Sequence, residues 1–330
     1  MLRWRPSNPR RASNAAGDGP AGLVCSWSAA RRERAVTAQA GRPTDMRAGE
    51  AQRAVAAAMS IASTLDVLVD DAVVLSNSNR LVVRLTPCDI VARVAPATHF
   101  ASSELEVEVV SRLAQTDSPV AGLDARFERC VFVRDGFEIA MWTYFEPVPA
   151  RVVPPVKYAQ ALERLHVGLR QIDVAVPHVM DRVGATQRDV ASRDVTPDLA
   201  VADRALLADT LRDLSLSIVD LKAPEQLLHG EPHPWNILDT EHGLLFIDFE
   251  NTARGPVEYD LAWVPGAVSR RYPDIDRDLL DNCRGVVLAI VATHRWRHDD
   301  QHPSGRRSGV AFLDVLRHGS PWPALDDVVW

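Results

Sequence analysis

The sequence predicts an α+β protein with two lobes, the first a small, mostly antiparallel sheet with one helix and the second larger and mostly helical. Strand-like segments crowd between residues 72 and 145, whereas apolar residues at helical spacing dominate after residue 155. The proline-rich segment 146–155 separates the two patterns and is typical of a connection between lobes. With 330 residues and 46% hydrophobic composition, the chain is long enough to bury a core in each lobe.

The first 50 residues lie outside this pattern. Residues 1–45 hold many more arginines than acidic residues, are rich in Ala, Gly, Pro and Ser, and show no amphipathic period. We expect a disordered basic extension, or a translation start at Met46, and exclude residues 1–50 from the predicted fold. A basic nucleic-acid-binding arm is the less favoured alternative, so nucleic acid is not an expected partner.

The first lobe, residues 55–146, opens with three predicted strands. "AVVL" at 72–75 and "LVVRL" at 81–85 flank the polar loop "SNSNR" at 76–80, and "IVARV" at 90–94 follows a turn.

A helix is predicted over residues 102–114, where leucine and valine recur at four-residue intervals. At about 100° per residue, Glu106 falls inside this apolar stripe. A carboxylate on a buried face needs a cation, and Arg93 on the neighbouring strand is the favoured partner. A capping box of Ser103 with Glu106 is the rival explanation.

The remaining elements divide between the lobes. Residues 130–145 predict a hairpin that turns at Asp135-Gly136, where tight turns need positive φ. The second lobe, residues 147–330, is predicted to be built mainly from helices, at 158–170, 202–221 and 277–298.

The cysteines and the apolar runs set the expected location. Four cysteines are scattered without a CxxC pair, which predicts neither a disulfide framework nor a zinc site and suits a reducing compartment. The apolar run at 285–293 is far shorter than the roughly 20 residues of a membrane span. We therefore expect a cytoplasmic protein that does not bind a membrane.

The segment "LLHGEPHPWNILDTEHGLLFIDFE", residues 227–250, places several polar groups in apolar surroundings. Phosphoryl transfer from ATP needs Mg²⁺ on the phosphates and a carboxylate that accepts the proton of the attacking hydroxyl. Asn236 and Asp248 offer the oxygen ligands that Mg²⁺ prefers, and Glu231 on the same loop as Asn236 is placed to be the base.

Three motifs resemble one enzyme family. "HGEPHPWNIL", "FIDFE" and "GPVEYDLAW" resemble the aminoglycoside phosphotransferase and choline kinase family, whose fold is bilobal and protein-kinase-like. The resemblance runs over roughly residues 60–325, and its specific part is 229–263. It implies an ATP- and Mg²⁺-dependent enzyme that phosphorylates a hydroxyl of a small molecule.

The resemblance also implies roles for individual residues. Glu231 would be the catalytic base, and Asn236 and Asp248 the Mg²⁺ ligands. His229 would organise the catalytic loop by hydrogen bonding, and Asp260 would anchor that loop.

Three nearby residues have less specific expected roles. His233 and Trp235 are interpreted as packing residues. Glu250 is interpreted either as a contact to a second Mg²⁺ or as a solvated strand end.

Two positions depart from the family pattern. The family most often has Asp where this chain has Glu231, and the extra methylene moves the carboxylate by about an ångström, which favours slower turnover or a shifted substrate hydroxyl. Kinases of this fold usually hold the α- and β-phosphates with a lysine on the third strand, where this chain has Arg93. Arginine is always charged and forks two donors onto phosphate, although a surface strand arginine is the simpler interpretation.

The loop after the first strand stands where related enzymes cover the phosphates. Its side chains, Ser76, Asn77, Ser78 and Asn79, offer hydroxyl and amide donors to the β- and γ-phosphates. A plain hairpin turn explains the loop almost equally well.

The acceptor is constrained only by charge. Residues 225–300 hold 14 acidic residues against seven arginines, which favours a hydroxylated and cationic small molecule. A nucleotide-binding pseudokinase that regulates a partner is the alternative, because the changes at Arg93 and Glu231 could have removed turnover. A protein kinase is disfavoured, because the chain has no HRD loop and no APE segment follows its "FIDFE" motif.

Overall fold

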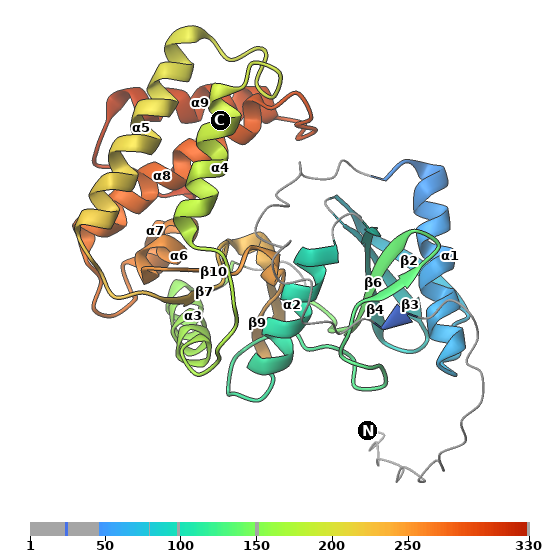
Figure 1. Cartoon of the computed structure of the whole chain (residues 1–330). Helices are drawn as coiled ribbons and strands as arrows, with labels where there is room; N and C mark the ends of the chain where they lie inside the picture. The colour runs from blue at the N-terminus through green and yellow to red at the C-terminus, as the bar shows by residue number, and fades with distance from the viewer. Residues whose placement is uncertain (1–23, 26–45, 79, 98–99, 149–151, 329–330) are drawn as a thin grey trace.

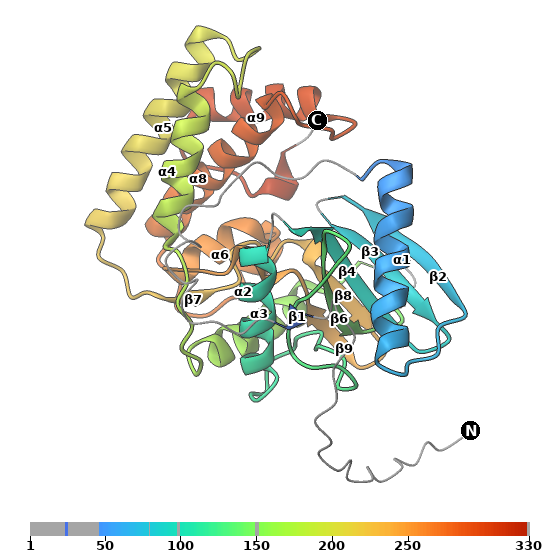
Figure 2. The same cartoon turned by 45° about the vertical axis from the view of Figure 1, so that its right-hand side comes forward.

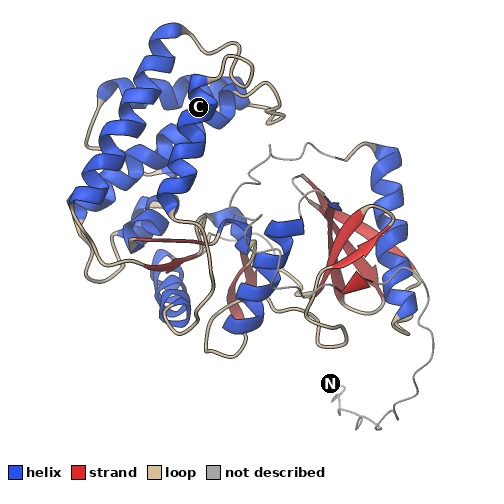
Figure 3. Cartoon of the chain, viewed as in Figure 1, coloured by secondary structure: helices blue, strands red, loops and turns tan. Residues whose placement is uncertain are grey.

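A computed structural model of the chain describes residues 24–25, 46–78, 80–97, 100–148 and 152–328. Figure 1 shows two lobes, and Figure 3 shows the strands gathered mainly in the first lobe and the helices dominating the second. The predicted α+β, two-lobed architecture is confirmed. The expected extension falls mainly on residues outside the described ones.

The first lobe is built on an antiparallel sheet in the order β1-β5-β6-β4-β3-β2. Its elements are β1 (Val24–Cys25), α1 (Ala48–Thr64), β2 (Asp71–Asn77), β3 (Leu81–Thr86), β4 (Ile90–Pro96), α2 (Phe100–Leu113), β5 (Phe132–Arg134) and β6 (Phe137–Thr143). The predicted hairpin turns at Asp135 (φ +51°) and Gly136 (φ +82°).

Helix α1 corrects the prediction of a single helix in this lobe. It lies against one face of the sheet (Figures 1 and 2). Its buried residues are mostly alanines, and they share a core with the alternate strand residues Val83, Ala92 and Met141. The prediction overlooked α1 because its buried stripe is mostly methyl groups, which give a weak apolar signal.

The other face of the sheet meets α2 and the second lobe. Side chains alternate across a strand, so Arg93 lies on the face opposite its buried neighbours Ala92 and Val94. Trp142 on β6 shares that face and packs with Val110 of α2 into the large core that continues through the second lobe. The sheet therefore presents Arg93 toward α2 and the second lobe.

The second lobe is larger and mostly helical. It comprises α3 (Pro155–Leu169), α4 (Val179–Ala191), α5 (Val201–Asp220), β7 (Gln226–Leu228), η3 (Pro234–Asn236), β8 (Ile237–Thr240), β9 (Gly243–Phe246), η4 (Phe249–Asn251), β10 (Ala253–Gly255), α6 (Val257–Trp263), α7 (Gly266–Ser269), α8 (Arg277–Trp296), α9 (Gly305–His318) and η5 (Leu325–Asp327). Helices α4, α6, α7 and α9 were not predicted. Two small antiparallel sheets of two strands each, β7 with β10 and β8 with β9, carry the polar segment.

The cysteines and the longest helices test two further expectations from the sequence. Cys130 is disulfide-bonded, whereas Cys88 and Cys283 are free, so the expectation of no disulfide is wrong for Cys130. No helix among the described residues is long and apolar enough to cross a membrane.

Candidate active site

The His229–Glu231 segment follows β7 and is fixed by Asp260 of α6. The Asp260 carboxylate accepts hydrogen bonds from the main-chain N–H groups of His229 (2.9 Å) and Gly230 (2.8 Å), and it contacts the His166 ring at 3.0 Å. Asp260 and His166 are fully buried, so these bonds satisfy a carboxylate that would otherwise be costly inside the protein.

Gly230 allows a close approach that no other residue could make. Its φ is +92°, and a Cβ at this position would lie 1.9 Å from the main-chain oxygen of Asn251. The loop therefore lies directly against η4.

His229 connects this loop to the end of β9. Its Nε2 donates to the Ile247 carbonyl oxygen at 3.0 Å, and its Nδ1 accepts from the Glu231 main-chain N–H at 3.4 Å. Burial lowers the pKa of His229, which favours the neutral imidazole that these two bonds require. The ring therefore organises the loop by hydrogen bonding.

Asn236 and Asp248 are brought together by the main chain. The Ile247 N–H donates to the Asn236 carbonyl oxygen at 3.0 Å, which places Asn236 beside the residue that precedes Asp248. The Asn236 Nδ2 donates to the Glu231 main-chain oxygen at 3.0 Å, so its Oδ1 is left as an acceptor. Asp248 follows β9 in the left-handed region, with φ +69° and ψ +62°, an uncommon conformation that often occurs at functional sites.

The predicted pair of Arg93 and Glu106 forms. Arg93 Nη1 donates to Glu106 Oε1, and Glu106 is only 2% exposed. The capping-box explanation is wrong, because α2 begins at Phe100 and the Ser103 hydroxyl instead contacts Arg80 and Glu138.

Arg93 also reaches across to the second lobe. Its Nη2 donates to Asp248 Oδ1 at 2.7 Å, and the same Glu106 oxygen that it contacts accepts the Phe249 N–H at 3.1 Å. Burial alone would raise the pKa of Asp248, but the Arg93 charge and hydrogen bond hold it below its ordinary value. Asp248 is therefore ionised at neutral pH.

Arg80 makes a second connection between the lobes that was not predicted. This buried residue, at the end of the polar loop, donates to Glu250 Oε2 at 3.1 Å and to Glu138 Oε1 at 3.1 Å. Glu250 was interpreted as a contact to a second Mg²⁺ or as a solvated strand end, and its pairing with Arg80 contradicts the solvated strand end.

The polar loop differs in part from its predicted form. Strand β2 continues through Asn77, so Ser76 and Asn77 belong to a strand. The Asn77 side chain is engaged with the main chain of Met46, accepting from its N–H at 3.0 Å and donating to its carbonyl oxygen at 2.9 Å. Ser78 lies at the turn, and Asn79 lies outside the described residues.

The carboxylate of Glu231 is held by two residues that sequence reasoning missed. Arg182 of α4 donates to Glu231 Oε1, and the Asn251 side chain donates to Oε2 at 3.0 Å. Arg182 lies three residues after Val179 and four before Thr186, on the buried side of its helix. That spacing was available in the sequence, but α4 itself had not been recognised.

One protein family matches most of this chain. The model of the phosphotransferase enzyme family matches residues 72–282, a range that includes strands β3 to β6, the His229–Glu231 loop and Asp260. The chain belongs to the phosphotransferase enzyme family.

Solved structures show the same fold as this phosphotransferase. An amicoumacin kinase, hAmiN, in complex with AMP-PNP, Ca²⁺ and Ami is 13% identical with a TM-score of 0.60, covering 83% of this chain and 97% of its own. The GDP complex of aminoglycoside 2'-phosphotransferase-IIIa is 16% identical with a TM-score of 0.60, covering 81% and 99%. Spectinomycin phosphotransferase APH(9)-Ia, with ADP and its antibiotic, is 14% identical with a TM-score of 0.55, covering 78% and 94%.

These likenesses confirm the protein-kinase-like, bilobal fold. Among curated proteins, none matches the sequence significantly.

The loop of the phosphotransferase also presents an exposed aromatic residue. Trp235 lies on η3 between Glu231 and Asn236, and it is 87% exposed, so its interpretation as a packing residue is wrong. His233 does pack, with its ring centroid 6.2 Å from that of Trp263. An exposed indole next to a candidate base is suited to contact a ligand.

The side-chain oxygen atoms of Asn236 and Asp248 are suitable ligands for a magnesium ion. An ionised carboxylate and a free amide oxygen are hard oxygen ligands, and Mg²⁺ keeps several waters, so two protein ligands suffice. Within the described part of the chain, no three His, Cys, Asp or Glu side chains gather in a metal-binding group.

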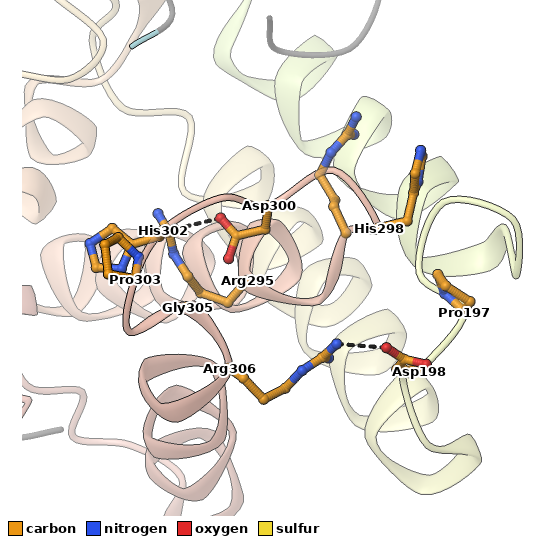
Figure 4. Close-up of a pocket in the computed structure, with 10 residues that line it drawn as sticks. Pro197, Asp198, Arg295, His298, Asp300, His302, Pro303, Gly305 and Arg306 are labelled. Carbon is orange, nitrogen blue, oxygen red and sulfur yellow. Dashed lines mark hydrogen bonds and ion pairs between the residues drawn. The ribbon is translucent and has the colours of Figure 1, made fainter. Parts of the chain in front are cut away.

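A pocket elsewhere in the second lobe is less suited to catalysis. It measures about 370 Å³ and is lined by Pro197, Asp198, Arg295, Arg297, His298, Asp300, His302, Pro303, Gly305 and Arg306. Figure 4 shows two of its arginines paired, Arg295 with Asp300 and Arg306 with Asp198. Because Arg297 pairs with Asp299, all three of its arginines are already partnered, and the pocket contains none of the catalytic candidates.

Proposed function

We propose that this phosphotransferase moves the γ-phosphoryl group of ATP to a hydroxyl of a small molecule in a Mg²⁺-dependent reaction. One observation carries the proposal: the Asn236–Ile247 main-chain bond and the Asn236–Glu231 side-chain bond join a base, an amide ligand and a carboxylate ligand in one hydrogen-bonded unit. The family match supports the phosphotransferase activity, and the nucleotides bound to the related structures support the donor class.

The proposed roles follow from the contacts. Asp248 and Asn236 would hold the Mg²⁺, which supplies charge neutralisation on the nucleotide phosphates when bound. Arg93 lies beside Asp248 and would bind phosphate oxygens with its forked donors, while Glu106 holds the guanidinium in place. In the polar loop, Ser76, Ser78 and Asn79 remain the candidate donors, since the amide of Asn77 is engaged.

Glu231 would act as the base. The acceptor oxygen forms a bond to the γ-phosphorus while the bond from that phosphorus to the bridging oxygen of the leaving ADP breaks. The acceptor's proton passes to the Glu231 carboxylate and then to solvent. Asn251 holds Glu231 Oε2, which orients the carboxylate for this role.

ADP release tests the proposal. The wild-type protein, given Mg²⁺ and ATP, is screened against hydroxylated acceptors. Glu231→Gln and Asp248→Asn should each reduce kcat by at least about a hundredfold, as expected for a lost base and a lost metal ligand. Glu241→Gln, an exposed carboxylate in the β8–β9 turn, is the matched control and should leave the rate unchanged.

A nucleotide-binding pseudokinase is the second candidate, and the engagement of both Arg93 and Glu231 by ion pairs favours it. It predicts saturable ATP binding with no ADP release above that of Glu231→Gln for any acceptor. Such a result would overturn the enzymatic proposal.

A further inference from the structure

The guanidinium of Arg182 lies next to Glu231, the proposed base, and only some of its N–H groups make hydrogen bonds to the described residues. Its side chain is 13% exposed, one amino group contacts Glu231, and the carbon of the guanidinium lies 5.1 Å from the Trp263 ring centroid. The other amino group, Nη1, is buried and has no hydrogen-bond partner among the described residues. Buried arginine donors are normally satisfied, so this one indicates a missing acceptor.

Two further donors near Arg182 are also unsatisfied. The Tyr259 hydroxyl and the Trp263 Nε1 are buried without a partner in the described part of the chain. The two rings are neighbours, with centroids 6.5 Å apart. Burial raises the pKa of Tyr259 to about 12, so its hydroxyl keeps the proton and remains a donor at neutral pH.

The Arg182 Nη1, the Tyr259 hydroxyl and the Trp263 Nε1 are therefore all hydrogen-bond donors. A ligand that bonds to them must offer oxygen atoms that accept hydrogen bonds. A carboxylate or a phosphate group has several charged oxygens and matches a forked guanidinium. A neutral hydroxyl would satisfy fewer of these donors.

The charged residues around Arg182 disfavour a cationic group on the substrate that accepts the phosphate. The nearby acidic residues are engaged: Asp248 by Arg93, Glu250 by Arg80 and Asp260 by His166 and main-chain N–H groups. An ammonium group about 4 Å from Arg182 would be repelled by about 4 kcal/mol at an effective dielectric constant near 20. These three carboxylates are thus not available to pair with a cationic substrate beside the base.

We propose that Arg182 determines acceptor specificity, by binding an anionic carboxylate or phosphate group on the molecule whose hydroxyl is phosphorylated. This inference rests on the proposed function and replaces the cationic acceptor expected from composition. Arg182 exchanges its contact with Glu231 for the acceptor's oxygens. Glu231 stays held by Asn251 and faces the hydroxyl as a released base.

The test compares acceptors of different charge. ADP release is measured with gluconate, glycerate and glycerol phosphate, with glycerol and glucose, and with choline and kanamycin. The wild type should prefer an anionic acceptor. In Arg182→Gln the ratio of kcat/KM for anionic over neutral acceptors should fall about ten- to a hundredfold, mainly through KM, because a charged hydrogen bond is lost.

Two further variants separate specificity from structure. Arg182→Lys keeps the charge and should recover part of the ratio, which a purely structural role would not produce. Arg188→Gln changes an exposed arginine on the same helix and should leave the ratio unchanged. Thermal melting establishes that each variant is folded.

The outcomes also separate this inference from the proposed function. Turnover with choline or kanamycin above that with any anionic compound, or an unchanged ratio in Arg182→Gln, would overturn the role of Arg182 while leaving the phosphotransferase intact. Without turnover for any acceptor, binding of gluconate and glycerol phosphate is titrated by tryptophan fluorescence. Binding that weakens at least tenfold in Arg182→Gln supports the anion site, and no such binding refutes it.

Discussion

At the scale of single residues, the site is organised by charges on otherwise apolar helix faces. Glu106 was identified from its phase on α2, because a carboxylate inside an apolar stripe must have a partner, and the structure supplies Arg93. Arg182 obeys the same rule on α4 but was missed together with its helix. Asn251 gave no such signal, since an asparagine after an apolar strand fits an ordinary turn equally well.

At the residue scale, we predict that activity depends on the length of the Glu231 side chain. Its carboxylate contacts Arg182 and Asn251 at once, and Asp at this position would withdraw it by about an ångström. We expect Glu231→Asp to lower kcat by about a hundredfold, because this site is built around the longer side chain. Steady-state kinetics with the acceptor found by the ADP-release screen measures the change.

Nucleotide binding is the control measurement for Glu231→Asp. The dissociation constant for Mg²⁺–ATP should stay within about threefold of the wild-type value, because Glu231 is not proposed as a metal ligand. A variant as fast as the wild type would show that the two contacts to Glu231 do not position it for catalysis.

At the scale of elements, the sequence predicted those with strong apolar contrast. Strand β3 alternates strictly between buried and partly buried residues, and β4 does so from Ile90 to Val94, so their pattern was clear. Helix α1 buries mostly alanines and α4 only four residues, two features that weaken the period on which such predictions rely. The order of the site residues along β7, β8 and β9 was predictable, but the helix that packs against the base was not.

At the element scale, we predict that the His229–Glu231 loop tolerates no side chain at Gly230. Gly230 and Gly243 both have positive φ, but a Cβ at Gly230 would meet Asn251 at 1.9 Å, whereas a Cβ at Gly243 would have nothing within 4 Å. Alanine at Gly243 should therefore cost about 1–2 kcal/mol of unfolding free energy from the backbone alone. Alanine at Gly230 should cost at least about 2 kcal/mol more and abolish activity, because η4 must move.

Urea denaturation of both variants measures this difference, with Gly243→Ala as the matched control. Equal losses in the two would mean that the loop can shift away from Asn251 without cost, and the proposed rigidity of the catalytic loop would be wrong.

At the scale of the whole molecule, partly buried ion pairs join the lobes across the site. Arg93 contacts Asp248, Arg80 contacts Glu250, and Glu106 accepts from the Phe249 main chain. Sequence reasoning found the Arg93–Glu106 half of this network, which lies within one lobe. It could not find the contacts with Asp248 and Glu250, because a pair separated by about 150 residues or more leaves no local pattern.

Glu138 makes this network sensitive to pH. It is fully buried on β6, its Oε1 accepts from Arg80 and Ser103, and its Oε2 has no partner among the described residues. Burial raises its pKa from 4.5 to about 7, although Ser103 and Arg80 oppose the shift. Between these values the folded protein keeps a proton that the unfolded chain has released.

The stability of the whole molecule should therefore fall as pH rises from about 4.5 to about 7, since the folded state binds more protons across that interval. The contribution of Glu138 is up to about 3 kcal/mol, which is fully present below the lower value and lost above the higher one. Urea denaturation of the wild type, Glu138→Gln and the exposed control Glu128→Gln at a series of pH values measures it. Glutamine cannot titrate and still offers an oxygen to Arg80, so the slope across this interval should flatten in Glu138→Gln and persist in Glu128→Gln. Parallel profiles in all three proteins would show that Glu138 is ionised throughout, and that Arg80 balances two full negative charges between the lobes.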